Sequence, residues 1–335
     1  MHSYSSPVRV GIAGATGYAG QELVSRLVRH PGVDVRLAMS SGPGSTARAL
    51  PRLAHVWKGQ IEPLDADRLR RDLDLVFLAV PEDASAALGA SLLSSGVRVI
   101  DLSGAFRIKD DGARQRWYPA TKALPDGSAY GLVEHYRAEV KDASLVACPG
   151  CYPTAALLAL LPLAHAGLLD RSADVVIDAK SGVSGAGRAP SDRTHFSENH
   201  GSVAAYGIFG HRHVAEMEQE LGATITFVPH LVPLDRGILE TIYVKTTAGT
   251  TPEAIADALT SAYAAEPFVR LTGDALPEIK HVAWTNFCDI GWRFDRSSRR
   301  LVLVSCLDNL VKGAAGQALQ NFNVACGFDE RTALL

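Results

Sequence analysis

One cysteine stands where the sequence predicts the start of a helix. The segment ACPGCYPT at residues 147–154 runs directly into an apolar stretch that predicts a helix over about residues 154–166. Pro153 suits the first turn of that helix, because the N–H that proline lacks is not needed there. Cys151 would lie at the N-terminal end, where the field of the helix stabilises thiolate over thiol. Cys151 is therefore a candidate nucleophile at neutral pH.

Two histidines around an arginine could supply the proton transfer that such a thiol needs. Gly210-His211-Arg212-His213 leads into a predicted helix near residues 213–221, so that His211 lies in the preceding turn. Making and breaking a hemithioacetal requires a proton donor and acceptor with a pKa near neutrality, for which histidine is the usual residue. We predict that His211 is the acid/base.

Arginine side chains and backbone N–H groups are the groups that would hold an anionic substrate or leaving group. The candidates are Arg107 in the segment SGAFR, the loop SGVSGAGR from Ser181 to Arg188, and Arg212. A surface salt bridge remains the alternative for each arginine.

The cysteines also allow roles other than that of a nucleophile. Cys151 could be a buried, unreactive thiol, as we expect for Cys288, Cys306 and Cys326. With Cys148 it could form a redox pair or half of a zinc site. A zinc site would draw on His195, His200, His211 and His213, but no second close cysteine pair accompanies them, so we predict no metal.

The N-terminal region predicts a dinucleotide-binding loop. A predicted strand, VRVGIAGA, leads into a helix from about Gly17 to His30, and glycines recur across this junction at positions 11, 14, 17 and 20. Small residues there let the backbone approach a pyrophosphate, which the positive helix end attracts. We expect the cofactor to contact the segment GATGYA, which comprises Gly14, Ala15, Thr16, Gly17, Tyr18 and Ala19.

The end of the second predicted strand favours NADP over NAD. A carboxylate there would bind a ribose 2′-hydroxyl and repel a 2′-phosphate. The strand instead ends in Ala38-Met39-Ser40-Ser41, with Arg48 a few residues on. We therefore predict NADP(H), with Ser40 and Ser41 as contacts.

The order of elements predicts an α/β protein of two domains. Residues 7–147 alternate β-rich and helical stretches, which indicates a Rossmann-type parallel sheet. After Cys151 the pattern becomes α+β, with a mostly antiparallel sheet whose exposed face we expect to mediate oligomerisation. Asp308 predicts the N-cap of a last helix that ends near Cys326. We assign residues 1–149 plus 308–335 to an NADP-binding domain and 150–307 to a catalytic and oligomerisation domain.

Composition excludes several classes of protein. The chain has 335 residues, 47% of them hydrophobic, and a formal net charge of −3 without a long basic run. A nucleic-acid or anionic-membrane surface is therefore not predicted. The longest apolar stretch, Ala155–Leu169, is too short to span a bilayer. An odd cysteine count of five and the lack of a signal-peptide pattern favour a reducing cytoplasm.

Nearly the whole chain resembles the N-acetyl-gamma-glutamyl-phosphate reductase family, the arginine-pathway relatives of aspartate-semialdehyde dehydrogenase. PGCYPTA at 149–155 and AYGIFGHRH at 205–213 are the most specific motifs. Further matches are GATGYAG at 14–20, DLSGAFR at 101–107, YGLVE at 130–134, SGVSGAGR at 181–188, PHLVPLDRGILETIYV at 229–244 and DNLVKGAAGQALQNFN at 308–323.

This resemblance implies a homodimer or homotetramer that reduces an acyl phosphate to an aldehyde with NADPH, in arginine biosynthesis. Cys151 would accept the acyl group and His211 would act as acid/base. Ser184 and Gly185 would contact the cofactor. The substrate-binding residues would be Arg107, Ser181, Arg188, Arg212 and Glu216.

Two departures and several rival functions accompany the resemblance. Cys148 replaces the family's usual asparagine, which predicts easier oxidative inactivation, and Glu82 follows Pro81 where relatives often carry histidine. The rivals are the same chemistry on an aspartyl, aminoadipyl or carrier-linked glutamyl phosphate, a non-catalytic NADP-binding redox sensor, and a thiol hydrolase.

Overall fold

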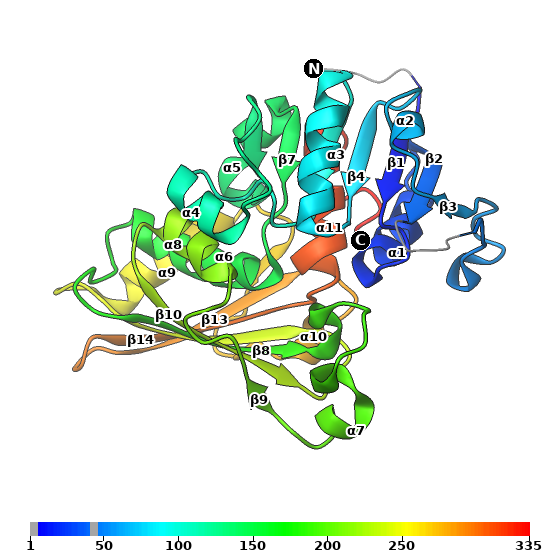
Figure 1. Ribbon diagram of the computed structural model, residues 1–335. Coiled ribbons are helices and arrows are strands. Elements are labelled where there is room, and N and C mark those ends of the chain that lie inside the picture. Colours follow the sequence, from blue (N-terminus) through cyan, green and yellow to red (C-terminus); the bar gives the residue numbers. More distant parts are fainter. Residues whose placement is uncertain (1–5, 41–45) are drawn as a thin grey trace. The chain divides into compact units, whose positions relative to one another are not determined.

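The computed structural model describes residues 6–40 and 46–335, which form two compact units (Figure 1). The first unit takes residues 1–150 and 314–335, and the second takes residues 151–313. Residues 308–313, which the sequence analysis placed with the nucleotide-binding domain, thus belong to the second unit. Among the described residues, no helix is both long and apolar enough to cross a bilayer.

The first unit is built on a seven-stranded sheet in which every strand pair is parallel. Its order is β3-β2-β1-β4-β5-β7-β6, so the chain reverses its direction across the sheet at β1. In such sheets ligands bind beyond the carboxyl ends of the strands at the reversal point. The strands are β1 (Val8–Ala13), β2 (Val33–Ser40), β3 (Ile61–Pro63), β4 (Leu75–Leu78), β5 (Arg98–Asp101), β6 (Ser128–Tyr130) and β7 (Leu145–Ala147).

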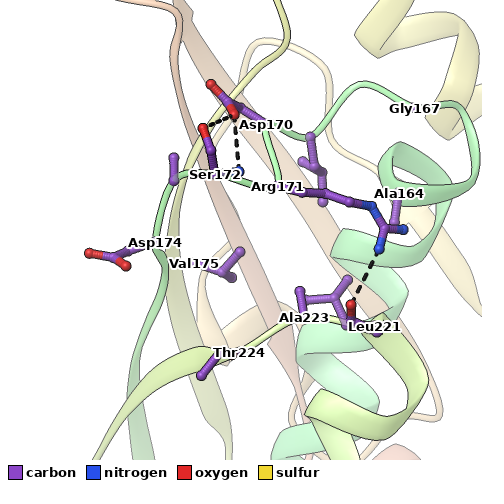
Figure 2. Close-up of a pocket in the computed structure, with 13 residues that line it drawn as sticks. Ala164, Gly167, Asp170, Arg171, Ser172, Asp174, Val175, Leu221, Ala223 and Thr224 are labelled. Atoms are coloured by element: carbon purple, nitrogen blue, oxygen red, sulfur yellow. Dashed lines mark hydrogen bonds between the residues drawn. The ribbon is translucent and has the colours of Figure 1, made fainter.

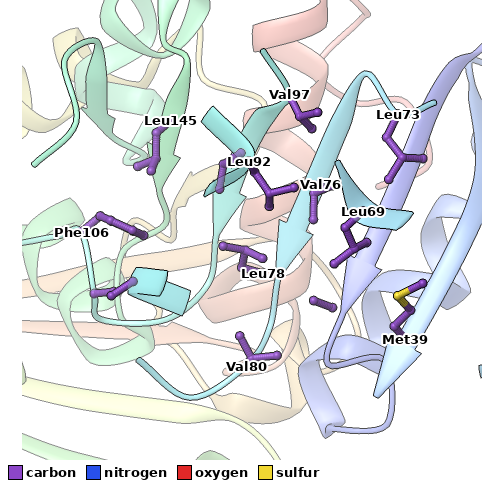
Figure 3. Packing of buried hydrophobic residues seen from close by; sticks show 14 of the residues in the cluster. Met39, Leu69, Leu73, Val76, Leu78, Val80, Leu92, Val97, Phe106 and Leu145 are labelled. Atoms are coloured by element: carbon purple, nitrogen blue, oxygen red, sulfur yellow. The ribbon is translucent and has the colours of Figure 1, made fainter. Parts of the chain in front are cut away.

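Helices cover both faces of this sheet, as expected for strands whose side chains are mostly buried. On one face, α3 packs on β4 and β5 over a hydrophobic cluster that includes Val76, Leu78 and Leu92 (Figure 3). On the other, α11 contacts α1, α5 and β5. The helices of this unit are α1 (Tyr18–Leu27), α2 (Ala66–Leu69), α3 (Glu82–Ser94), α4 (Asp111–Trp117), α5 (Val133–Asp142) and α11 (Gly316–Cys326).

The second unit contains a mixed sheet of seven strands in the order β12-β13-β14-β11-β8-β10-β9. Its pairs are antiparallel except β8 with β10 and β12 with β13, so the predicted fold class is confirmed. The strands are β8 (Val175–Gly182), β9 (Ala204–Ala205), β10 (Ile225–Val232), β11 (Ile238–Lys245), β12 (Val269–Leu271), β13 (Cys288–Asp295) and β14 (Arg300–Leu307).

One face of this second sheet is covered by helices and the other is largely open. Buried and half-exposed residues alternate along β8 and β10, as a sheet with one covered face requires. Helix α6 packs on β11 and β14 and also contacts α8 and α9. The helices of this unit are α6 (Cys151–His165), α7 (Phe196–Asn199), α8 (His213–Leu221), α9 (Pro252–Tyr263) and α10 (Ile279–Val282).

Local turns set the ends of two elements in the last third of the chain. Strand β13 begins only at Cys288, because α10 ends at Val282 and Trp284 turns the chain with a φ of 70°. The predicted last helix starts with a π-helical turn, Val311–Ala315, before α11. Asp308 caps that turn as expected, since its Oδ1 accepts the N–H groups of Leu310 at 2.8 Å and Val311 at 3.1 Å.

A carboxyl group is buried within the second sheet, and the described residues give it no hydrogen-bond partner. Glu240 on β11 is fully buried on the covered face, where it pairs in register with Ser305 of β14 and Ala179 of β8. Burial raises its pKa well above the usual value, and the charge of Lys180 only partly opposes this effect. Burial therefore favours the neutral acid form of Glu240 over its carboxylate.

This burial predicts a pH-dependent gain in stability for Glu240→Gln. Because the pKa is raised in the folded state, the carboxyl favours folding below its unfolded pKa of about 4.3 and loses that contribution as pH rises. The variant's gain in free energy of unfolding over the parent should therefore be larger at pH 8 than at pH 4. Denaturant unfolding at both pH values tests this, with the exposed Glu139→Gln as control.

Candidate active site

Cys151 is the first residue of α6, three residues earlier than the start expected for this helix. The helix runs for 15 residues, and every residue from Tyr152 to Leu163 is buried. Cys151 itself is half-exposed. A partly accessible thiol at the N-terminal end of a long, firmly packed helix is the arrangement that favours a reactive thiolate.

Aromatic rings surround His211 next to this helix start. The imidazole packs edge-on against Tyr152, Tyr206 and Phe227, with ring centroids 5.8, 5.7 and 5.3 Å away. The hydroxyl oxygens of Tyr152 and Tyr206 lie 3.2 Å apart. Burial raises the pKa of the Tyr206 hydroxyl, and the neighbouring Cys151 raises it further. Cys151 and His211 therefore share Tyr152 and Tyr206 as neighbours.

His211 is neutral in this environment. Burial among the rings, with the adjacent Arg212 as a second cause, lowers its pKa to about 4. Its Nδ1 accepts the backbone N–H of His213 at 3.2 Å. A neutral ring whose Nδ1 accepts carries its proton on Nε2. The free protein thus offers an N–H donor at this position, in place of the group with a pKa near neutrality that the sequence analysis expected.

Tyr206 is the residue near the thiol that sequence reasoning missed. It lies just beyond β9, and its backbone N–H donates to Pro229 on β10. The guanidinium of Arg193 lies 5.1 Å from the centre of its ring. Its place inside the motif AYGIFGHRH was the only available signal, because a single tyrosine in a polar loop does not reveal what it faces.

The loop after β8 brings three of the predicted residues together. Ser181 is buried at the end of β8, and a Cβ on Gly185 would lie 2.8 Å from its Oγ. Ser184 lies in the same turn, and its Oγ accepts Nδ2 of Asn309 at 3.0 Å. Ser181 also lies within hydrogen-bonding reach of the Tyr152 hydroxyl, where it opposes the rise in the tyrosine's pKa. The end of β8 and the loop that follows it therefore lie next to Tyr152, which also contacts Tyr206 and His211.

The other charged candidates of this unit are more scattered. Arg188 and Arg212 are exposed, whereas Glu216 is fully buried on α8. His213 contacts the ring of His211, with centroids 4.7 Å apart. His195 and His200, the further histidines of the zinc alternative, are exposed and flank α7 at its two ends.

Arg107 belongs to the first unit and holds the segment that leads to Cys151. It is buried, and its Nε donates to the carbonyl oxygen of Cys148 at 2.7 Å while Nη2 donates to that of Leu102 at 3.0 Å. These bonds fix the end of β7 relative to the end of β5. Its predicted contact with substrate stays a prediction.

Cys148 is a poor nucleophile. It is buried, and burial raises its pKa to about 12. The amide of Asn321 lies 3.6 Å from its sulfur. Because the thiolate is the form that oxidises, this environment argues against the easy oxidation expected from a second thiol near Cys151.

The glycine loop at the end of β1 has the shape of a dinucleotide cradle. Gly14 has a φ of 93°, and a Cβ there would lie 2.1 Å from the carbonyl oxygen of Ala79. A Cβ on Gly20 would lie 2.2 Å from the carbonyl oxygen of Gly14. Thr16 hydrogen-bonds to Ser40 at 2.9 Å, joining the loop to the end of β2. Of the other predicted cofactor contacts, Ala15 lies in this loop, and Tyr18 and Ala19 are the first two residues of α1. Ser41 lies outside the described residues.

Gly17 differs from these two glycines because the protein leaves room for a side chain there. It is the N-cap of α1 with a φ of −68°, and the nearest atom to a Cβ would be 3.6 Å away. Neither strain nor packing requires glycine at this position. A pyrophosphate that approaches the helix N-terminus closely would require it, because a side chain there would be in the way. The cradle therefore fits a dinucleotide.

Gly17→Ala should accordingly weaken cofactor binding without weakening the fold. We expect the Kd for NADPH to rise about tenfold or more, which corresponds to about 1.4 kcal/mol, while Tm stays close to that of the parent. Gly20→Ala, which would clash with the Gly14 carbonyl, should lower Tm as well. Titration of NADPH fluorescence and thermal unfolding measure the two effects. Parent-like affinity in Gly17→Ala would count against pyrophosphate binding at this cradle.

A separate cavity of the second unit lies at the other end of β8 (Figure 2). Its volume is about 330 Å³, and its walls include Asp170, Arg171 and Val175. Arg171 donates to the carbonyl oxygen of Gly222 at 3.2 Å. Val175 and Ser181 stand six residues apart on β8, which is about 20 Å in an extended strand. The cavity is therefore distinct from the surroundings of Cys151 and Tyr152.

Comparisons with known proteins agree with this arrangement. Residues 9–143 match the family described as "Semialdehyde dehydrogenase, NAD binding domain", and residues 151–309 match "Semialdehyde dehydrogenase, dimerisation domain". Among solved structures, aspartate semialdehyde dehydrogenase II from Vibrio cholerae superposes with a TM-score of 0.72 at 19% identity, covering 95% of this chain and 98% of that one. At this identity the similarity establishes the fold alone.

Sequence relatives are more specific. The N-acetyl-gamma-glutamyl-phosphate reductases of Shouchella clausii and Bacillus subtilis are 44% and 42% identical to this chain, each over 98% of both sequences. Agreement at this level extends through both units. The chain belongs to the N-acetyl-gamma-glutamyl-phosphate reductases, within the semialdehyde dehydrogenase family.

Proposed function

We propose that this protein carries out the reaction of its family, the NADPH-dependent reduction of N-acetyl-gamma-glutamyl phosphate to N-acetyl-glutamate semialdehyde, through a thioester on Cys151. The observation that carries the proposal is the half-exposed thiol of Cys151 at the first residue of α6, with a neutral His211 packed against the adjacent Tyr152. The family places the step in arginine biosynthesis, and a free thiol nucleophile suits a reducing cytoplasm.

The first half of the reaction transfers the acyl group. The Cys151 thiolate attacks the acyl carbon, a C–S bond forms, and the C–O bond to phosphate breaks. The departing phosphate takes up one proton. The N-terminal field of α6 favours the thiolate that starts this step and lies close to the oxygen that gains charge.

The second half is a reduction, for which the bound nicotinamide supplies the hydride. The thioester carbon is reduced, its oxygen becomes the oxyanion of a hemithioacetal, and breaking the C–S bond returns the thiolate to Cys151 and releases the aldehyde. We assign to His211 the role of stabilising this oxyanion, because its neutral Nε2–H can donate a hydrogen bond to the oxygen on which the charge develops. The aromatic rings of Tyr152 and Tyr206, whose hydroxyls are paired with each other, pack edge-on against the imidazole and hold it in place.

The residues that would hold the cofactor lie in the glycine cradle, from Gly14 to Ala19, and at Ser40. No carboxylate stands at the described end of β2, where one would repel a 2′-phosphate. This supports the preference for NADP. Ser184 and Gly185 remain our proposed contacts on the second unit.

The identity of the acyl group in the substrate is tested with the reverse reaction, the phosphate-dependent oxidation of an aldehyde by NADP. Purified protein is given NADP, inorganic phosphate and one aldehyde at a time, and NADPH formation is followed by absorbance. We expect kcat/KM to be highest for N-acetyl-glutamate semialdehyde, with aspartate and aminoadipate semialdehydes as competitors. A higher value for either competitor would overturn the proposed substrate. Oxidation that does not require phosphate would overturn the acyl-phosphate chemistry.

The protein has its family's dimerisation domain, and we propose that it forms a homodimer or homotetramer through the open face of the second sheet. That face carries Val176, Val228 and Tyr243, which offer apolar surface for packing against a second copy of the chain. Asp178 lies among them and is paired with Lys180 at 2.6 Å.

Introducing a charge on this face should separate the subunits. Tyr243→Glu places a carboxylate on the open face at a position that is 44% exposed in the isolated chain. We expect sedimentation analysis to show a shift towards monomer, while Tm determined at low concentration changes little. The same substitution at the exposed Tyr18 in the first unit is the control. An unchanged oligomer in Tyr243→Glu would place the interface elsewhere.

A further inference from the structure

A turn of the second unit presses against the nucleophile. Gly313 belongs to the π-helical turn that follows β14, and a Cβ on this residue would lie 2.6 Å from the Cβ of Cys151 and 3.1 Å from its Cα. Real Cβ atoms essentially never approach other atoms as closely as the first of these distances. The backbone of Gly313 therefore packs directly on the backbone of Cys151, in a space that no side chain can share.

Close approach is what requires glycine here. Gly313 is not among the glycines with positive φ, so alanine could adopt its backbone conformation without strain. The third nearest atom to the missing Cβ is Leu307 Cδ1 at 3.3 Å, a side-chain atom that can yield. The obstacle to a methyl group is thus Cys151 itself.

Neither partner in this contact can easily move away. The turn is fixed by Asp308, which is fully buried and whose Oδ2 accepts Nη1 of Arg236 at 3.1 Å and the N–H of Trp284 at 2.6 Å. Gly313 itself donates to the carbonyl oxygen of Asp308 at 2.9 Å. On the other side, Cys151 continues into α6, whose next twelve residues are buried.

We infer that Gly313 is a positioning residue for Cys151, and that the turn from Asp308 to Gly313 holds the thiol where the reaction needs it. The inference rests on the proposed role of Cys151 as nucleophile. Asn309 ties the same turn to the rest of the site, because its Oδ1 accepts the N–H of Gly237 at 2.7 Å and its Nδ2 donates to Ser184. The turn thereby connects the nucleophile with the loop after β8.

The test is Gly313→Ala, assayed for turnover and for the reactivity of the thiol. A displacement of about 1 Å at a reacting atom costs about 10²-fold in rate, so kcat should fall by about that factor. KM for the acyl phosphate should change little, because no group that binds it is removed. The rate of Cys151 alkylation by iodoacetamide should fall, with its pH midpoint shifted upwards as the sulfur leaves the helix field.

Gly291→Ala is the matched control. Gly291 on β13 is as crowded, since its Cβ would lie 2.7 Å from Thr272 Oγ1 and 2.8 Å from Pro277 Cδ, but none of its three nearest contacts is Cys151. In the Gly291→Ala variant, the rate and pH dependence of Cys151 alkylation should equal those of the parent, even though the Tm of the variant falls. If both variants lose kcat in proportion to their loss of Tm, Gly313 has only a packing role and the inference fails.

Two further outcomes keep the inference separate from the proposed function. Parent-like kcat and alkylation in Gly313→Ala would overturn the inference, while an inactive Cys151→Ser protein would still support the thioester route. If Gly313→Ala does not fold, Asn309→Ala takes its place, because it loosens the turn without adding an atom. That variant should alkylate Cys151 more slowly, and a parent-like rate would overturn the inference.

Discussion

Cys151→Ser is expected to lower kcat by about 10⁴-fold or more while leaving the fold and cofactor affinity intact. Loss of an enzyme's nucleophile typically costs on this scale. Serine keeps the size of the side chain, but its hydroxyl does not ionise near neutral pH as a thiol at a helix N-terminus can. The measurement is the rate of NADPH oxidation with N-acetyl-gamma-glutamyl phosphate.

Cys306→Ser is the matched control for this substitution. Cys306 is buried in the second sheet against Val282 and Val304, on the face opposite Glu240, where the register places it beside Leu239. Its replacement should lower Tm but leave kcat within a few-fold of the parent. Residual turnover in Cys151→Ser above one per cent of the parent value, with an unchanged Tm, would remove Cys151 as the acyl acceptor.

His211→Ala is expected to lower kcat by about 10³-fold, the usual consequence of removing a donor to a developing oxyanion. His211→Gln should retain more activity, because the glutamine amide keeps an N–H donor near the position of Nε2. Equal losses in the two variants would indicate that the imidazole must transfer a proton and does not merely donate a hydrogen bond. Both variants are compared by kcat at saturating substrate.

The pH profile offers an independent test of the state of His211. Its pKa is lowered to about 4 by burial, so the ring is neutral above about pH 5 and becomes protonated only below that. Activity that needs the neutral ring should therefore persist on the acid side down to about pH 5, with no step near the usual histidine pKa of about 6.5. An acid limb near 6.5 that disappears in His211→Gln would contradict this assignment.

Much of the fold follows from short-range patterns in the sequence. The continuous apolar run that forms β4 requires a sheet covered on both faces, and the structure provides one. The alternating pattern of β10 and β11 requires one covered face, which α6 supplies. The caps at Asp308 and Gly327 were also predictable, because each depends on one residue and its immediate neighbours.

The contacts that shape the site could not be predicted in the same way. Tyr206 and His211 meet Tyr152 only because the sheet and α6 bring residues more than fifty positions apart together. Gly313 is separated from Cys151 by the whole second unit, and nothing local in the segment VKGAA reveals that contact. The low pKa of His211 likewise arises from rings that the fold assembles around it.

Cys148 shows how burial changes the interpretation of a motif. From its spacing alone, a second thiol three residues before the nucleophile suggests oxidation or a redox pair. Cys148 is the residue that follows β7, and its burial raises the pKa of the thiol and keeps it protonated. Arg107 donates a hydrogen bond to its carbonyl oxygen. Its neighbour in sequence, Cys151, differs because it opens a helix and remains half-exposed.

The most direct test of the account is mass spectrometry of the protein after incubation with N-acetyl-gamma-glutamyl phosphate in the absence of NADPH. We expect one N-acetylglutamyl group on the peptide that contains Cys151, sensitive to hydroxylamine as a thioester should be, and lost when NADPH is added. An acyl group on another residue, or no covalent adduct in a protein that turns over normally when NADPH is present, would contradict the thioester route.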